Sequence, residues 1–230
     1  MKHLSLFLLG TILITGIAVA QKNDVTVKIF QQHITQPNIQ LLDVRTANEY
    51  KDGHIKNALQ ADWTNQDQFK ERIKYLDKNK PVLLYCASGG RSGQAAEWLY
   101  SNGFKQVENL KGGFIQWKQE NQPFEGTANT PQITMDIYKN YTTSSAAVLI
   151  QFGADWCPPC KLMTPVVESV KAELKDKFKF VHVDGGIHTN VMKQLNIEAL
   201  PTFIVYKNGK EIWRKQGVTE KSELIKQLTR

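Results

Sequence analysis

Short apolar runs alternate with amphipathic segments along most of this 230-residue chain. Residues 39–44 and 81–85 are apolar runs bounded by polar residues, a pattern typical of strands buried in a parallel sheet. Between them, residues 66–78 place Phe69 and Ile73 on one face of a predicted helix. Because strands that alternate with helices pack as sheets covered by helices, the pattern predicts an α/β fold.

The alternation occurs in two series separated by one break. Residues 125–131 (EGTANTP) are small, polar and punctuated by Gly and Pro, which is typical of a linker. Each flanking series, over residues 21–124 and 132–230, spans about 100 residues and is long enough for its own core, so we expect two α/β domains. The other predicted elements of the first series are a helix over 91–101, a strand over 106–110 and a helix opened by Gly112-Gly113. Those of the second are strands over 148–152, 178–183, 202–206 and 211–213 and helices over 158–174, 189–195 and 221–228.

The first 20 residues differ from the rest of the chain. After Lys2 and His3, an uncharged apolar stretch ends in Ala18-Val19-Ala20, before polar Gln21. An apolar stretch that ends in a small-x-small site is typical of a secretory signal peptide. We therefore expect residues 1–20 to be removed, no stable membrane insertion afterwards, and an exported bacterial protein, periplasmic or secreted. An uncleaved anchor is the alternative, because the stretch is long for a signal core.

The charge of the chain says little about its partners. The formal net charge is +7, but the basic residues are dispersed and form no dense run. A solvated basic surface is therefore favoured over a nucleic-acid site, and we predict no nucleic-acid partner.

Cysteine usage is more informative. The chain has three cysteines, too few for a disulfide scaffold. Cys157 and Cys160 form a Cys-x-x-Cys, whereas Cys86 stands alone. In an exported protein a single leftover cysteine indicates a reactive thiol or intermolecular pairing, so all three thiols are predicted to be chemical rather than structural.

Cys86 lies between the predicted strand over 81–85 and the helix over 91–101. Backbone N–H groups in such a loop converge on the thiol, and the helix N-terminus adds positive potential. Both effects lower the thiol pKa and favour an anion beside the sulfur. We therefore predict that Cys86 and Arg91 are catalytic, with Arg91 bracing the loop or contacting an anionic group. The predicted substrate-binding residues here are Ala87, Ser88, Gly89, Gly90 and Ser92, with Gly89 and Gly90 supplying the φ values of a tight cradle.

Several motifs in order across residues 25–123 resemble the rhodanese family. They are Leu42-Asp43-Val44-Arg45, Glu49-Tyr50, Gly53-His54-Ile55-Lys56-Asn57-Ala58, the Cys86 loop, Gly112-Gly113, Trp117 and Pro123. The resemblance implies a parallel-sheet α/β domain in which Cys86 accepts a sulfane sulfur as a persulfide and passes it to a nucleophile. It makes Asp43, Arg45 and His54 support residues of a structural polar network.

Two alternatives to sulfur transfer remain for this domain. Cysteine-dependent phosphatases, as a class, use Cys-x5-Arg to cradle phosphate, and the loop here is one residue shorter, which favours sulfur. A catalytically silent module is the second alternative, although Cys86 and its loop are intact. Ala87 and Ser88 lack positive side chains, which argues against thiosulfate as the natural donor.

Cys157 and Cys160 follow a predicted strand and open a predicted helix. The first thiol lies at the helix N-terminus, where the dipole favours thiolate, and the second lies one turn along, within reach of a mixed disulfide. Pro158 and Pro159 are tolerated because the first N–H groups of a helix are unpaired. Half of a zinc site or a static disulfide is the alternative. Zinc would need two further ligands and no second Cys pair exists, so we predict no metal and no cofactor.

Residues 132–230 resemble thioredoxin. The motifs are the run from Phe152 to Lys161 with Trp-Cys-Pro-Pro-Cys at its centre, Pro165, Val183-Asp184, Leu200-Pro201-Thr202, Gly209 and Gly217. The resemblance implies an α/β/α domain in which Cys157 and Cys160 are catalytic. It also implies that Pro201 is cis and faces Cys157, and that Trp156, Leu200 and Pro201 bind substrate.

Two residues depart from the thioredoxin pattern. Gln151 occupies the position of a buried Asp in cytosolic thioredoxins, and the Lys that they carry near Phe180 is missing. That carboxylate assists deprotonation of the resolving thiol, so Cys160 must rely on water or on another group. The direction of the reaction, reductant or oxidant, stays open.

The sequence favours an exported thiol–disulfide oxidoreductase combined with a sulfurtransferase. Cys86 would form a persulfide, and Cys157 and Cys160 would exchange disulfides or reduce that persulfide. The expected partners are protein thiols and disulfides and small sulfane-sulfur donors. The alternatives are an oxidoreductase whose rhodanese-like domain only binds a partner, and a non-catalytic adaptor.

Overall fold

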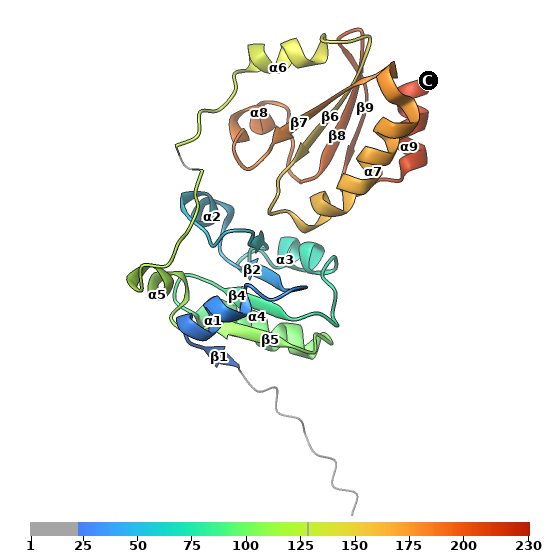
Figure 1. The fold of residues 1–230 in the computed structure, drawn as a ribbon. Helices are drawn as coiled ribbons and strands as arrows, with labels where there is room; N and C mark the ends of the chain where they lie inside the picture. Colours follow the sequence, from blue (N-terminus) through green and yellow to red (C-terminus); the bar gives the residue numbers. More distant parts are fainter. Residues whose placement is uncertain (1–22, 128) are drawn as a thin grey trace, which may run out of the picture.

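A computed structural model describes residues 23–127 and 129–230 and shows two α/β domains in succession (Figure 1). The signal peptide predicted over residues 1–20 lies outside these residues. Among the helices of the described part of the chain, none is long and apolar enough to cross a membrane.

The first domain is built on a five-stranded parallel sheet, as expected. Its strand order is β1 (Asp24–Val25), β5 (Val107–Leu110), β4 (Val82–Tyr85), β2 (Gln40–Asp43) and β3 (Leu59–Gln60). Every residue of β4 is buried, which explains its continuous apolar sequence.

Helices cover both faces of this sheet. α3 (Gln66–Ile73) and α4 (Gly90–Ser101) pack on one face, where Phe69 and Leu99 join Leu84 in a core. α1 (Val27–His33) and α5 (Gly113–Gln119) pack on the other, against Leu83. The neighbours Leu83 and Leu84 enter different cores because successive side chains of a strand point to opposite faces. The short α2 (Ala47–Asp52) follows β2.

The second domain contains a mixed four-stranded sheet with the order β7 (Lys179–Asp184), β6 (Ala147–Gly153), β8 (Thr202–Lys207) and β9 (Lys210–Gln216). β6 and β7 are parallel, and the other neighbours are antiparallel. α7 (Pro158–Leu174) and α9 (Lys221–Thr229) pack on one face; α6 (Met135–Thr142) and α8 (Thr189–Gln194) pack on the other. A single 3-10 turn, η1 (Lys175–Lys177), follows α7.

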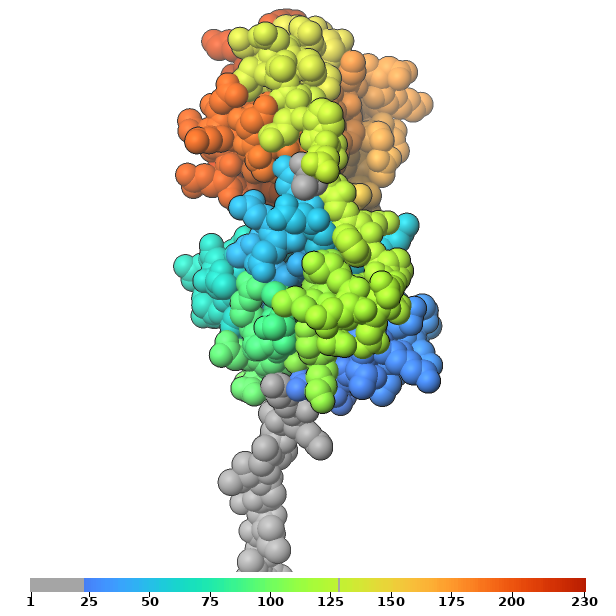
Figure 2. All heavy atoms as spheres, turned by 90° about the vertical axis from the view of Figure 1, so that its left-hand side faces the viewer, coloured from blue at the N-terminus to red at the C-terminus, as the bar shows by residue number. Residues whose placement is uncertain are grey.

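The chain leaves the first domain gradually. Glu125, the first residue of the predicted linker, forms an isolated antiparallel bridge with His54, and the N–H of Thr127 donates to the carbonyl of Lys51 at 2.8 Å. Figure 2 shows this yellow-green segment rising along the surface toward the second domain. The start of the predicted linker is therefore held on the first domain.

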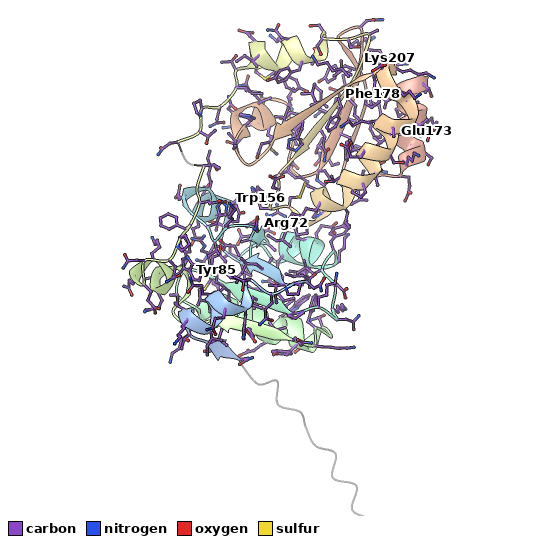
Figure 3. The ribbon with its side chains drawn as sticks, viewed as in Figure 1. Arg72, Tyr85, Trp156, Glu173, Phe178 and Lys207 are labelled. Carbon is purple, nitrogen blue, oxygen red and sulfur yellow. A yellow bond between two sulfur atoms is a disulfide. The ribbon has the colours of Figure 1, made fainter. Side chains whose placement is uncertain are left out.

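The two domains meet at the loop between β6 and α7. The N–H of Gln60, at the end of β3, donates to the carbonyl of Trp156 at 2.8 Å. The Arg72 guanidinium lies 5.0 Å from the Trp156 ring centre, and the Tyr50 ring lies 5.7 Å from it. Figure 3 shows Trp156 and Arg72 at this junction. The first domain therefore covers part of the loop that carries Cys157.

Candidate active sites

The Cys86 thiol lies in a loop built to receive hydrogen bonds. Cys86 directly follows β4 and is 1% exposed. The N–H of Gly89 lies 3.1 Å from its Sγ and the hydroxyl of Ser92 lies 3.3 Å from it. Because α4 begins at Gly90, the sulfur also lies at the N-terminal end of a 12-residue helix.

These hydrogen-bond donors lower the pKa of the Cys86 thiol. Burial is the largest single influence and raises the pKa of Cys86. Hydrogen bonds from Ser92, and from the backbone of Ser88 and Gly89, together lower it by more, so the pKa lies below its usual value. A thiol held in this way is suited to an anionic sulfur.

The structure corrects one detail of this loop. Gly89 has φ +96°, in the left-handed region that favours glycine. Gly90 is the first residue of α4 and is not among the residues with positive φ in ranges 23–127 and 129–230. The prediction that Gly90 also supplies a special φ value is therefore wrong, because the turn is complete before the helix begins.

A contact that the sequence reasoning missed holds the other side of the loop. The N–H of Phe114 donates to the carbonyl of Cys86 at 2.8 Å, and that of Ile115 donates to the carbonyl of Ala87 at 3.0 Å. Gly113 has φ +59°, and a Cβ there would lie 2.5 Å from the Cys86 oxygen. The pair Gly112-Gly113 is the signal in the sequence, since only glycine permits this approach.

Arg91 braces the Cys86 loop against α2. Its guanidinium makes two hydrogen bonds to the carboxylate of Glu49, at 2.9 and 2.6 Å, and so ties α4 to α2. This pairing lowers the pKa of Glu49 to about 2. Sequence reasoning did not assign Glu49 a role. Its signal was the capping box that it forms with Thr46 at the start of α2.

The predicted support residues form a buried polar network. Arg45 and Asp43 make a bidentate ion pair with a closest distance of 2.6 Å, and Arg45 also donates to the carbonyl of Gly53. His54 stacks on Tyr50 with ring centres 3.7 Å apart. The sequence predicted this structural role for Asp43, Arg45 and His54.

The second site is a disulfide at the start of a helix. Cys157 is the residue directly before α7, and Pro158 and Pro159 are the first two residues of that helix. A disulfide joins Cys157 to Cys160. Cys157 is fully buried and Cys160 is 5% exposed. The peptide bond before Pro201 is cis, as predicted, and the Sγ of Cys157 lies 3.6 Å from the Leu200 carbonyl oxygen.

Trp156, predicted to bind substrate, contacts the first domain. Its indole packs against the core that contains Tyr50 and Tyr85. Arg72, which covers it, is itself buried, and burial lowers the pKa of Arg72 to about 10. Sequence reasoning did not predict Gln60 or Arg72 at this contact, since neither belongs to a motif.

The Cys86 loop and the Cys157 loop are held by different residues. The Cys86 loop is held by α2 and α5, whereas the Cys157 loop is held by Gln60, Arg72 and Tyr50. α2 touches both environments, through Glu49 on one side and Tyr50 on the other. Within residues 23–127 and 129–230, no three His, Cys, Asp or Glu side chains gather as a metal-binding group.

A Cys-x-x-Cys disulfide at a helix N-terminus, on a mixed sheet beside a cis-proline, defines a thiol–disulfide oxidoreductase of the thioredoxin fold. Comparison with known proteins finds a matching family model for each half of the chain. The family model described as "Rhodanese-like domain" matches residues 26–120, and the model described as "Thioredoxin" matches residues 129–230.

Individual relatives point the same way. A thioredoxin of Chlamydia trachomatis serovar D is 39% identical over 87 residues, which are 38% of this chain and 84% of that protein. The chloroplastic Thioredoxin Y of Oryza sativa subsp. japonica is 41% identical over 85 residues, 37% of this chain, and this chain spans only 51% of that protein. The uncharacterized protein YqhL of Bacillus subtilis is 45% identical over 78 residues, 34% of this chain and 60% of that protein. The chain therefore belongs to the thioredoxin family and carries a rhodanese-like domain ahead of its thioredoxin domain.

Proposed function

We propose that this chain is an exported enzyme that takes up a sulfane sulfur on Cys86 and releases it as sulfide with the dithiol Cys157/Cys160. One observation carries the proposal. The Cys86 thiol receives hydrogen bonds from Gly89 and Ser92 at a helix N-terminus, and a redox dithiol lies in the same chain. The first arrangement suits a persulfide, and the second supplies the two electrons that its reduction requires.

The proposed steps balance in atoms and electrons. A sulfane-sulfur donor, such as a thiosulfonate, transfers its outer sulfur to the Cys86 thiolate, and a sulfinate leaves. The Cys157 thiolate then attacks the inner sulfur of the persulfide, which forms a Cys86–Cys157 disulfide and expels hydrosulfide. Cys160 attacks this mixed disulfide, which forms Cys157–Cys160 and returns the Cys86 thiol. An external dithiol reductant regenerates the enzyme.

A single-turnover measurement tests the coupling. The reduced chain is mixed with one equivalent of a thiosulfonate and no other reductant, and sulfide is measured. The wild-type chain is expected to release close to one equivalent, whereas Cys157→Ser accumulates the Cys86 persulfide and Cys86→Ser forms none. Unchanged sulfide release from Cys157→Ser would contradict the coupling.

A second candidate function is favoured by the contacts of Trp156. In this alternative the rhodanese-like domain performs no chemistry and only binds the substrate face of the thioredoxin domain, through Gln60 and Arg72. A Cys86→Ser chain that reduces protein disulfides normally and that replaces the wild-type chain in the cell would support this alternative. A non-catalytic adaptor is excluded by any measurable rate of insulin reduction or sulfur transfer.

Export is part of the proposal and rests on residues 1–20. Their apolar stretch and the Ala18-Val19-Ala20 site support cleavage before Gln21. N-terminal sequencing of the protein isolated from a bacterial host is expected to begin at Gln21. A chain that still begins at Met1 in the membrane fraction would favour the anchor.

A further inference from the structure

The exchange at Cys157 and Cys160 requires a proton acceptor for the second thiol. A mixed disulfide at Cys157 is resolved only when Cys160 attacks it, and the thiolate, not the thiol, is the attacking form. At neutral pH an ordinary cysteine is largely protonated. The resolving step therefore depends on a group near Cys160 that can take its proton.

Cys160 opens onto a cavity on the side of α7 that faces β6 and β7. The cavity has a volume of about 200 Å³, large enough for several water molecules. Besides Cys160, it is lined by Gln151 of β6, His182 of β7 and the charged side chains of Asp155, Lys161 and Glu168. A proton can therefore leave Cys160 through water in this cavity.

The sheet register places an imidazole in this cavity. Gln151 and His182 are direct partners in the parallel pairing of β6 with β7. The Nε2 atom of His182 would lie 3.1 Å from a Cβ built on Gly153, so the ring reaches along the sheet toward the loop that carries the disulfide. No hydrogen bond of the His182 ring is found among residues 23–127 and 129–230, whereas the ring of His188 is bonded to Ile133. The imidazole is thus unengaged.

The other groups of the cavity are less suited to the task. The amide of Gln151 is not a base, and the ammonium group of a lysine such as Lys161 donates hydrogen bonds but accepts none. The carboxylate of Glu168 forms an ion pair with Lys171 at 2.8 Å. Asp155 and His182 are both exposed, but a carboxylate is in general a weaker base than an imidazole near pH 7.

From this geometry we infer that His182 is the proton acceptor for Cys160, through water in the cavity between β6, β7 and α7. The inference rests on the proposed exchange at Cys157/Cys160 and names the base that serves it. As Cys160 attacks the mixed disulfide, its proton passes through water to His182 and leaves an imidazolium. The departing thiolate, or bulk water, takes that proton afterwards.

A two-step disulfide reaction separates this role from the exchange itself. The reduced full chain, with Cys86→Ser so that two thiols remain, is mixed with dithiobis(nitrobenzoate) in a stopped-flow instrument. The first equivalent of coloured thiolate reports the attack by Cys157 and depends on reagent concentration. The second reports the attack by Cys160, and its rate is independent of concentration because the step is intramolecular.

In this Cys86→Ser background, His182→Gln is expected to release the first equivalent at the rate of the parent chain and the second about tenfold to a hundredfold more slowly at pH 7. The pH dependence of the second-step rate is expected to differ between the two chains, because His182→Gln has lost the proton acceptor. Glu168→Gln, at the same cavity, is the matched control and is expected to behave like the parent chain.

Two results would overturn the inference. One is a second-step rate and pH profile in His182→Gln that match those of the parent chain, with the first step intact. The other is absence of the first release in the parent Cys86→Ser chain, which would refute the exchange itself. Because these results concern different equivalents of thiolate, the failure of His182 is distinguishable from the failure of the proposed function.

Discussion

The Cys86 thiolate depends on individual donors. Ser92 is the largest cause that lowers the pKa of Cys86, through its hydroxyl and its backbone, against the opposing effect of burial. In a chain with Cys157→Ser and Cys160→Ser, only this thiol titrates. We expect Ser92→Ala to raise the pKa of Cys86, measured by the ultraviolet absorbance of the thiolate, and Ser101→Ala, a serine at the exposed end of α4, to leave it unchanged. Equal titration curves for Ser92→Ala and its parent would contradict this role.

Gly113 provides a second test at the residue scale. An alanine there would bring its Cβ within 2.5–2.7 Å of backbone atoms of Cys86 and Ala87, at a positive φ. We expect Gly113→Ala to lower the free energy of unfolding by about 2 kcal/mol or more in urea titrations. Gly90→Ala is the matched control, because nothing lies within 4 Å of a Cβ at that helical position. It is expected to change stability by less than about 1 kcal/mol. Similar losses for both variants would show that the close approach is not the cause.

At the scale of elements, the ion pair between Arg91 and Glu49 joins α4 to α2. The pKa of Glu49 falls from 4.5 to about 2 in the folded chain. Because the folded pKa is the lower one, the pair stabilises the fold fully above pH 4.5, and this contribution is lost as the pH falls toward 2. We expect Glu49→Gln to be less stable at pH 7 and to lose less stability on acidification than the wild type, measured by urea unfolding at a series of pH values. Parallel curves for the two chains would contradict the pairing.

The sequence predicts long elements well and short ones poorly. The helix over 158–174 has the predicted bounds, because seventeen residues show the helical period clearly. α2 has six residues and β3 has two, too few for any period, and they were missed. α3 ends at Ile73 rather than at residue 78, since the chain continues in tight turns that bury Leu76 without a helix. β9 extends to Gln216, beyond the predicted 213, because an edge strand tolerates the polar Arg214 and Lys215.

The site residues follow the same division. Cys86, Cys157 and Cys160 stand in motifs whose chemistry is local, so the sequence predicts their surroundings. The partners of Arg91 and Trp156 come from distant segments, and only the folded chain brings Glu49 and Arg72 to them. Single-sequence reasoning has no means to pair such residues.

At the scale of the whole molecule, Cys86 and Cys157 are both buried while the two domains are in contact. Cys86 is 1% exposed and Cys157 is fully buried, so the two sulfurs cannot meet unless a contact opens. The contact best placed to open is that of Trp156 with Gln60 and Arg72, because it joins the two domains.

Weakening this contact is expected to expose Cys157. In the reduced Cys160→Ser chain, Arg72→Ala removes the guanidinium over the indole, and we expect alkylation of Cys157 by iodoacetamide to become about tenfold faster. Lys70→Ala, at an exposed position of α3, is the control and is expected to leave the rate unchanged. Equal rates for Arg72→Ala and its parent would mean that docking does not protect the thiol.

The most direct test of the central claim is to trap the intermediate that joins the two domains. The Cys160→Ser chain cannot resolve a disulfide at Cys157, so a Cys86 persulfide made with a thiosulfonate should stop at the mixed disulfide. Peptide mapping under non-reducing conditions is expected to find Cys86 linked to Cys157 within one chain, together with one equivalent of sulfide. A Cys86 persulfide that persists beside a free Cys157 thiol would contradict the claim that the two sites act on the same sulfur.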